Sequence, residues 1–317
     1  MSVATVSRVI NNIEAVRPET AKKVLETIKK LNYQPNFTGR NLRTQRTGLI
    51  LVVLPTIVNP FFAKVVKGME DAANENDYNI LICTTYENKK IEYSHLKLMQ
   101  SKLVDGVVFL DTSIGESEFQ KFAKNYPVVQ CSEYYENMHV PYVSVDNEQA
   151  AYDAVKHLID SGCKRILQFS ANNNSMTTIK RRQGYVRALK EANLTFEDTL
   201  KGNYGYQSTI KILDERLKTG LDFDGIFAIS DRMAAGCIHS LLRHDINVPD
   251  RVKVVGFDNV EISYITSPEI TTVSQSQHEM GYLAVELLIK RIKAEHVNEK
   301  NLINHKLIIR ESTSVLR

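Results

Sequence analysis

From Thr47 onward the chain alternates short apolar segments with longer amphipathic ones, and no other feature constrains its fold as strongly. Apolar segments of strand length lie at residues 48–55, 78–84, 105–111, 127–132, 142–146, 164–171, 224–230, 252–258 and 269–275. Segments with helical spacing of apolar residues lie between them, at residues 62–76, 88–102, 117–125, 148–161, 179–193, 206–218 and 232–244. This alternation predicts an α/β fold of doubly wound parallel sheets, with helices on both faces of each sheet.

The length of the chain, 317 residues, accommodates two such sheets. The pattern Asp-Gly followed by apolar residues occurs at positions 105 and 224, which predicts two domains of similar build. No apolar run approaches the length that spans a bilayer, and the N-terminus lacks the apolar core of a signal peptide. We therefore expect a cytoplasmic protein without a membrane partner.

The sequence lacks the motifs of common nucleotide-binding and hydrolytic enzymes. Its 14 glycines include no G-x-G pair, and neither G-x-S-x-G nor H-E-x-x-H occurs. The 4 cysteines include no C-x-x-C pair, so buried free thiols are a better interpretation than a disulfide or a metal site. We expect no enzymatic activity, no cofactor and no metal. An open α/β sheet without cofactor chemistry binds small ligands at the carboxyl ends of its strands, here between the two domains.

Residues 1–46 differ from the remainder in charge. They carry nine Lys and Arg residues against three Glu, a net charge of +6, whereas the remainder carries −3. Two amphipathic helices are predicted there, one capped by Ser2 and one beginning at Pro18. The positive charge suits the phosphate backbone of a nucleic acid, and charge alone leaves a solvated charged surface as the alternative.

Ordered motifs across the whole chain resemble the LacI/GalR family of bacterial transcription regulators. The motifs are "SVATVSRVINN", "RPETAKKVLETIKKLNYQPN", "NPFF", "DGVVF", "HLIDSGCKRI", "RRQGYVRAL", "ISDRMAAG", "VPDRVKVVGFDN" and "TTVSQ". Within the family, "GRNLR", "CSEYYENMHVPYVSVDN" and "IIRESTSVL" look most like the cytidine-responsive regulators, with the catabolite-control regulators as the second choice. The resemblance implies a periplasmic-binding-protein-like body, a helix-turn-helix headpiece, operator DNA and a small effector as partners, and a homodimer.

The resemblance also implies which residues contact DNA. In the family, the second helix of the helix-turn-helix enters the major groove. Here that helix starts at residue 3 and the first helix is absent. A misassigned start or a trimmed chain is the favoured explanation, and natural loss of DNA binding is the alternative. The chain as printed is expected to bind operator DNA weakly. The resemblance implies that Val3, Ala4 and Arg8 face base edges, and that Thr5, Ser7 and Asn11 contact phosphates or brace the helix. It places Asn36 and Leu42 in the hinge, with Leu42 as the candidate minor-groove wedge.

The effector site implied by the resemblance combines aromatic rings, carboxylates and an arginine. Its residues are Phe61, Phe62, Thr177, Arg181, Tyr204, Asp231 and Asp258. Aromatic rings offer a flat apolar face, aspartates accept hydrogen bonds from hydroxyl groups, and an arginine donates two bonds in fixed geometry. Relatives that bind purine bases carry an arginine where Ser175 falls, so a nucleoside or a sugar is expected rather than a purine corepressor.

Each of these residues also has an ordinary structural interpretation. Phe61 and Phe62 could belong to the core, Asp258 could cap a helix, and Arg181 could be solvated. If they do line a site, Arg181 and Asp258 are expected to face a water-filled cleft, so that replacing them costs little stability.

The expected organisation has four parts, and the expected function is a repressor of a catabolic or transport operon. The parts are a headpiece at residues 1–34, a hinge at 35–46, a first subdomain at 47–146 with 276–305, and a second at 147–275 with 306–317. The alternative function is a stand-alone sugar- or nucleoside-binding protein that does not bind DNA.

Overall fold

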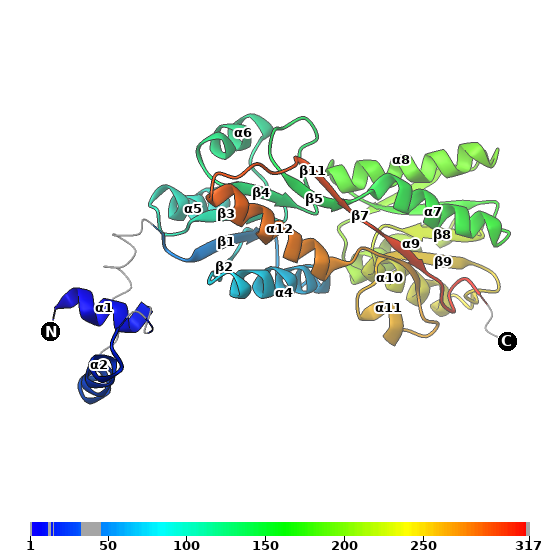
Figure 1. The fold of residues 1–317 in the computed structure, drawn as a ribbon. Helices are drawn as coiled ribbons and strands as arrows, with labels where there is room; N and C mark the ends of the chain where they lie inside the picture. The colour runs from blue at the N-terminus through cyan, green and yellow to red at the C-terminus, as the bar shows by residue number, and fades with distance from the viewer. Residues whose placement is uncertain (1, 12–13, 15, 33–45, 315–317) are drawn as a thin grey trace. The chain divides into compact units, whose positions relative to one another are not determined.

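The computed structural model describes residues 2–11, 14, 16–32 and 46–314. The chain divides into two compact units, Met1–Thr47 and Gly48–Arg317, which we call the headpiece and the body (Figure 1). Among the described helices, none combines the length and the apolar character needed to cross a membrane.

The described headpiece consists of two helices, α1 (Val3–Asn11) and α2 (Pro18–Leu31). Ser2 Oγ accepts a hydrogen bond from Thr5 N at 3.2 Å, as expected for a cap, and Pro18 occupies the first turn of α2. Val9, Ala21 and Val24 form the buried centre between the helices. This small apolar contact is what holds the two described helices together.

The body contains two six-stranded sheets, and the predicted fold class is confirmed. The first sheet has the order β11-β5-β4-β3-β1-β2 with every pair parallel; its strands are β1 (Leu49–Leu54), β2 (Asn79–Thr84), β3 (Gly106–Phe109), β4 (Val128–Cys131), β5 (Tyr142–Val145) and β11 (Lys300–Ile303).

The second sheet has the order β12-β10-β9-β8-β6-β7, and only the β10–β12 pair is antiparallel. Its strands are β6 (Ile166–Ala171), β7 (Asp198–Gly202), β8 (Gly225–Ala228), β9 (Lys253–Asp258), β10 (Thr271–Ser274) and β12 (Lys306–Ile308).

Helices cover both faces of each sheet because alternate strand residues point to opposite sides. In β1, Ile50 and Val52 pack on the side of α4 (Pro60–Glu75) and α12 (Gln277–Ile292). Leu51 and Val53 pack on the side of α5 (Lys89–Gln100) and α6 (Glu116–Asn125).

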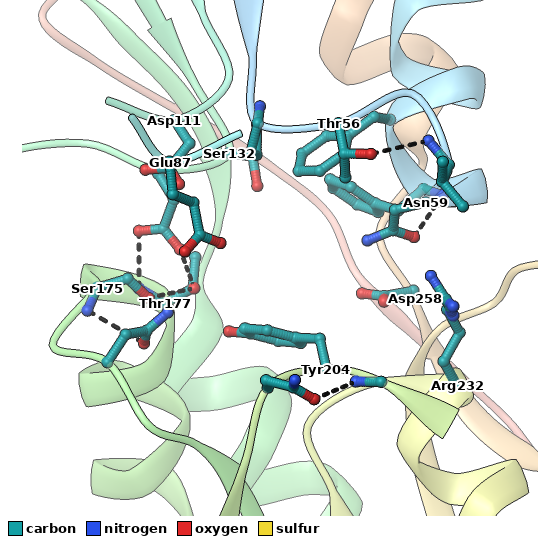
Figure 2. A pocket seen from close by; sticks show the side chains of 18 of the residues that line it. Thr56, Asn59, Glu87, Asp111, Ser132, Ser175, Thr177, Tyr204, Arg232 and Asp258 are labelled. Carbon is teal, nitrogen blue, oxygen red and sulfur yellow. Dashed lines mark hydrogen bonds between the residues drawn. The ribbon is translucent and has the colours of Figure 1, made fainter. Parts of the chain in front are cut away.

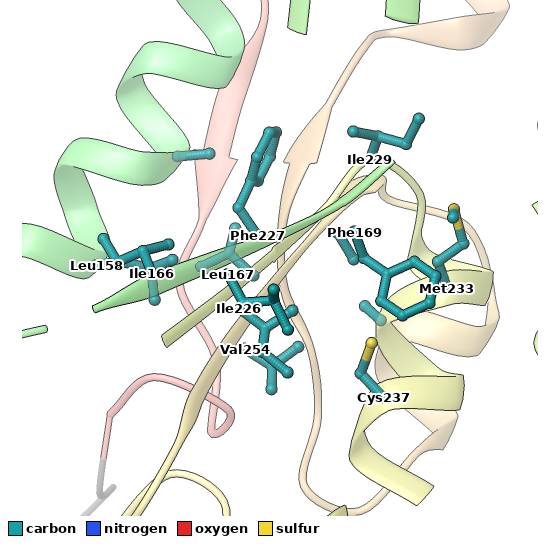
Figure 3. Close-up of a cluster of buried hydrophobic side chains, with 14 of the residues drawn as sticks. Leu158, Ile166, Leu167, Phe169, Ile226, Phe227, Ile229, Met233, Cys237 and Val254 are labelled. Atoms are coloured by element: carbon teal, nitrogen blue, oxygen red, sulfur yellow. The ribbon is translucent and has the colours of Figure 1, made fainter. Parts of the chain in front are cut away.

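The second sheet is covered by α7 (Asn147–Asp160), α8 (Met176–Glu191), α9 (Tyr206–Leu217) and α10 (Asp231–Arg243), with the short α11 (Ile262–Ile265) beside α10. Figure 3 shows its core, in which Phe169, Met233 and Cys237 lie on one side of the strands and Leu158 lies on the other. The four cysteines are free thiols, and Cys131, Cys163 and Cys237 are buried.

The chain passes between the two sheets at three described connections, after β5, after β10 and after β11. In each sheet the carboxyl ends of the parallel strands lie along the same edge. The three connections bring these two edges to face each other, with a space between them.

Candidate ligand-binding site

A cavity of about 350 Å³ lies within the body, at the carboxyl ends of strands from both sheets (Figure 2). Its lining residues are Pro55, Thr56, Val58, Asn59, Phe61, Phe62, Glu87, Asp111, Ser132, Glu133, Asn173, Ser175, Thr177, Arg181, Asn203, Tyr204, Gly205, Arg232, Asp258 and Gln275. The volume suits a small organic ligand, and the mixture of rings and polar groups is typical of a ligand pocket.

The start of α4 supplies the aromatic part of the first wall. Asn59 caps this helix, since its Oδ1 accepts a hydrogen bond from Phe61 N at 3.1 Å. The rings of Phe61 and Phe62 pack edge to face with their centroids 5.5 Å apart. The cap fixes the first turn of α4 and therefore fixes where both rings meet the cavity.

The same wall also carries three carboxylates. Glu87 follows β2, Asp111 follows β3, and Glu133 follows β4. Burial, followed by the negative charge of Glu133, raises the pKa of Asp111 well above its usual range.

The second wall centres on Arg181 of α8, which is 5 % exposed. Its Nε donates to Asn147 Oδ1 at 2.9 Å, its Nη1 donates to Ile229 O at 2.6 Å, and its guanidinium lies 3.7 Å from the centroid of the Phe257 ring. These contacts orient the guanidinium while leaving it on the cavity lining.

Asp258, the last residue of β9, lies beside this arginine and is 7 % exposed. Its Oδ1 accepts a hydrogen bond from Gln275 Nε2 at 2.6 Å and lies 4.0 Å from Arg181 Nη1. Burial raises the pKa of Asp258, and the nearby guanidinium of Arg181 opposes that rise.

Tyr204 and Thr177 complete the lining between the walls. The hydroxyl of Tyr204 lies 3.1 Å from Thr178 Oγ1. Glu133, from the first sheet, accepts hydrogen bonds from Thr177 N at 3.2 Å and from the Thr177 hydroxyl, so this contact joins the two halves of the body.

Four lining residues adopt a positive φ, a backbone conformation that L side chains rarely take. They are Glu87 (57°), Ser132 (72°), Tyr204 (60°) and Asp258 (111°). Such conformations are unfavourable, and they cluster where a side chain must be held at a functional position.

Six of the seven predicted effector residues line this cavity: Phe61, Phe62, Thr177, Arg181, Tyr204 and Asp258. The structure does not bring Asp231 to it. The Asp231 carboxylate points inward from the first turn of α10, where it accepts hydrogen bonds from Val260 N at 2.8 Å and Thr272 Oγ1 at 2.5 Å. Asp231 is fully buried and braces the strand ends from behind the site.

Arg181 and Asp258 line the cavity, as expected, but their side chains are only 6% and 10% exposed. This burial argues against the expectation that replacing them costs little stability. Reasoning from the sequence also missed Glu87, Asp111, Ser132, Glu133, Arg232 and Gln275. Each lies at the end of a predicted strand or within three residues after it, which was the available signal, since strand ends of a parallel sheet meet at one edge.

The predicted DNA-contacting residues lie in the headpiece. Ala4 and Arg8 are exposed on α1, and Thr5 is half-buried. The side chains of Val3, Ser7 and Asn11, and the whole of Asn36 and Leu42, lie outside the described residues.

Comparison with known proteins gives two family matches. Residues 47–311 match the model for periplasmic binding proteins and the sugar binding domain of the LacI family. Residues 1–36 match the model for bacterial regulatory proteins of the lacI family.

Individual relatives match over almost the whole chain. Catabolite control protein A of Priestia megaterium is 36% identical, over 99% of this chain and 96% of that protein. The HTH-type transcriptional repressor CytR of Escherichia coli K12 is 29% identical, over 100% of this chain and 94% of that protein. The lac repressor dimer bound to operator and the anti-inducer ONPF superimposes with a TM-score of 0.91 over 99% of this chain and 96% of that one; at 20% identity, this supports the fold alone.

Proposed function

Because this chain belongs to the LacI family of bacterial regulatory proteins, we propose that a small polyhydroxylated ligand in the cavity controls how tightly its headpiece binds operator DNA. The chain is a DNA-binding transcription regulator with a ligand-binding body, and it is not an enzyme. We place its action in the cytoplasm, where operator DNA is found, and its most natural role is that of a repressor.

The observation that carries the proposal is the composition of the cavity. The buried ring of Phe61 and the half-buried rings of Phe62 and Tyr204 line the cavity and offer apolar faces to a sugar or nucleoside ring. Asp258 and Arg181, both fixed by other contacts, offer an acceptor and charge-assisted donors to hydroxyl groups.

The proposed lobes that enclose the ligand are residues 47–146 with 276–305, and residues 147–275 with 306–317. Pairing of β11 with β5 and of β12 with β10 supports this division. Residues 1–34 are the proposed headpiece and 35–46 the hinge through which ligand binding would act. The match of residues 1–36 to a DNA-regulator family favours this function over a stand-alone binding protein.

A sugar or a nucleoside is the proposed ligand class. The family description of the body names sugar binding, and the resemblance to cytidine-responsive regulators supports a nucleoside. Ser175 carries no positive charge with which to contact a purine, which argues against a purine corepressor. Its hydroxyl instead caps α8 by accepting a hydrogen bond from Thr178 N at 3.3 Å.

We also propose that the chain forms a homodimer through exposed apolar residues of the body. Leu81 and Ile82, on the edge strand β2, are 38% and 45% exposed. Tyr264 and Ile265, on α11, are 47% and 67% exposed. An exposed sheet edge with apolar side chains is suited to a second copy of the chain, and a twofold dimer matches two operator half-sites.

A thermal-shift panel of pentoses, hexoses and nucleosides, cytidine included, tests the ligand class. A ligand present at 100 times its Kd should stabilise the protein by about 2.7 kcal/mol, which is readily visible as a higher melting temperature. Asp258→Asn should weaken binding of that compound by about ten- to a hundredfold, because an amide accepts a hydroxyl proton less strongly than a carboxylate. Unchanged affinity in Asp258→Asn would show that the ligand binds elsewhere.

A further inference from the structure

Resting on the ligand-binding function proposed above, we propose that the ligand carries a protonated amine, as an amino sugar does. Its ammonium group would lie against the carboxylates of Glu87, Asp111 and Glu133, with its ring and hydroxyl groups facing the opposite wall. Three observations support it: the distribution of charge around the cavity, the way Asp111 is held, and a hydroxyl on the cavity lining that no described residue bonds.

Charge is distributed unevenly between the two walls. The lining residues from the first sheet and its helices include three carboxylates and no Lys, Arg or His. Both cationic residues of the described lining, Arg181 and Arg232, come from α8 and α10 over the second sheet. Figure 2 shows Glu87 and Asp111 together on one side of the cavity, and Asp258 with Arg232 on the other.

A buried carboxylate fixes the position of Asp111. Glu92 of α5 is fully buried and accepts hydrogen bonds from Thr112 Oγ1 at 2.5 Å and from Ser113 N at 2.7 Å. Asp111 Oδ1 accepts a bond from Thr112 N at 2.7 Å, and no described residue donates a hydrogen bond to Oδ2. One oxygen of a firmly held carboxylate is therefore free for a ligand.

Ser132 supplies the second polar group without a partner. It is 7% exposed, and Figure 2 shows its side chain directed into the cavity. Its backbone N–H donates to Val143 O at 2.8 Å, but no described residue bonds its hydroxyl. The hydroxyl therefore faces the cavity with its donor and acceptor positions open, and this position is suited to a ligand with a polar group of its own.

Repulsion between carboxylates gives this wall its preference for a cation. Glu133 and, more weakly, Glu87 and Glu92 add to the burial that raises the pKa of Asp111. A neutral ligand would leave Asp111 protonated, whereas an ammonium group would favour its ionised form and be attracted to the neighbouring carboxylates. Glu133 already accepts two bonds from Thr177, which leaves Asp111 and Glu87 as the principal contacts.

The amine should also couple binding to pH. The titratable and charged groups around Asp111 are Glu87 before α5, Glu92 on α5, Glu133 and Tyr135 after β4, and, across the cavity, Arg181, Tyr204, Arg232 and Asp258. A bound ammonium favours the ionised form of Asp111, so binding releases a proton wherever the unliganded carboxyl is protonated. Because the pKa of the unliganded Asp111 is raised to about 8, amine affinity should rise as the pH approaches that value, as long as the amine itself stays protonated.

An organic cation fits better than a metal ion. Among the described residues, no three or more His, Cys, Asp and Glu side chains are grouped so that they could hold one.

The test uses the full chain and measures binding by calorimetry at neutral pH. The probes are glucose bearing an amine at carbon 2, carbon 3 or carbon 6, and the neutral controls are glucose and N-acetylglucosamine. We expect at least one amine to bind at least about tenfold more tightly than both neutral compounds. Titration in two buffers of different ionisation enthalpy should show proton release for that amine.

Asp111→Asn is the decisive variant, with Glu116→Gln as its control. The amide keeps the shape of Asp111 and can still accept the bond from Thr112 N, so the variant should fold. The ratio of amine affinity to glucose affinity should fall about tenfold in Asp111→Asn. Glu116 is an exposed residue of α6 outside the lining, and its neutralisation should leave the ratio unchanged.

The outcomes separate this inference from the function on which it rests. A neutral compound that binds as tightly as every amine contradicts the inference and leaves the proposed function standing. Failure of every amine to bind also contradicts the inference, and the neutral sugars and nucleosides then decide the proposed function separately. If the ratio of amine affinity to glucose affinity falls equally in Glu116→Gln, the preference for the amine comes from the net charge of the protein. That result would contradict a contact between the ammonium group and Asp111.

Discussion

At the scale of single residues, buried carboxylates link the stability of the body to pH. Burial, together with a nearby carboxylate, raises the pKa of Asp231, and burial raises the pKa of Asp258. As pH rises above about 4, the unfolded chain loses these protons while the folded protein retains them, so each raised pKa makes folding less favourable until the folded carboxyl also ionises.

Asp258→Asn should therefore remove part of this pH dependence. Between about pH 4 and about pH 7, the melting temperature of the parent should fall relative to that of the variant, because the amide has no proton to lose. Asp245→Asn, at an exposed turn position, is the control and should follow the parent. Parallel curves for the parent and Asp258→Asn, measured by calorimetry across this range, would contradict the buried environment assigned to Asp258.

Arg181→Ala should be strongly destabilising, contrary to what the sequence suggests. Removing the guanidinium leaves Asn147 Oδ1, Ile229 O and the Asp258 carboxylate without their cationic partner in a buried site. Loss of one partner from such a site costs about 3–5 kcal/mol, measurable by urea unfolding. A cost below about 1 kcal/mol would mean that water reaches the arginine freely.

At the scale of elements, α4 and α12 approach so closely that neither helix tolerates a side chain at the contact. A Cβ built on Gly68 would lie 1.9 Å from His278 O, and one built on Gly281 would lie 1.9 Å from Val65 O. Both obstacles are backbone atoms of the facing helix, so the helices would have to separate.

Gly68→Ala should consequently lower the free energy of unfolding by several kcal/mol, although alanine in an isolated helix is about 1 kcal/mol more favourable than glycine. Gly115→Ala provides the control, because nothing lies within 4 Å of its Cβ position and its φ is −64°. Urea unfolding of both variants checks this; a Gly68→Ala variant as stable as the parent would contradict the close packing of α4 on α12.

Most helices and strands of the body could be predicted from the sequence, because their apolar residues clearly follow either helical spacing or the run of a buried strand. The polar strand β7 was missed because its residues Asp198–Gly202 are mainly half-buried at a sheet edge. The helix α12 was missed for the opposite reason: it buries Met280, Gly281, Ala284 and Leu287 around much of its circumference, which obscures a single apolar stripe. The edge strands β11 and β12 are short and were missed too.

Side-chain direction limited what the sequence could say about the site. The family resemblance identified the arginine, the rings and Asp258, all of which line the cavity. Asp231 also follows a strand end, but its first-turn position on α10 directs it toward Val260 and Thr272, which no spacing rule reveals. Asp111 and Glu133 meet only because β3 and β4 are neighbours in the sheet, a fact of topology rather than of local sequence.

At the scale of the whole molecule, the proposed dimer depends on exposed apolar residues of the body. Ile265→Asp should shift the protein toward monomer at micromolar concentration, because a carboxylate would be buried without a partner in the interface. Sedimentation of the parent, of Ile265→Asp and of the control Ile309→Asp checks this; Ile309 follows β12 directly and is 56% exposed. A monomeric parent, or equal dissociation of both variants, would contradict the assigned surface.

The measurement that tests the account most directly is the affinity of the full chain for a selected operator duplex, with and without the ligand identified by the thermal-shift panel. At one fixed salt concentration, saturating ligand should change the duplex affinity by about 5- to 150-fold, and duplex should change the ligand affinity by the same factor. Identical duplex affinities in the presence and absence of a ligand shown to occupy the cavity would contradict the proposal that this cavity controls DNA binding.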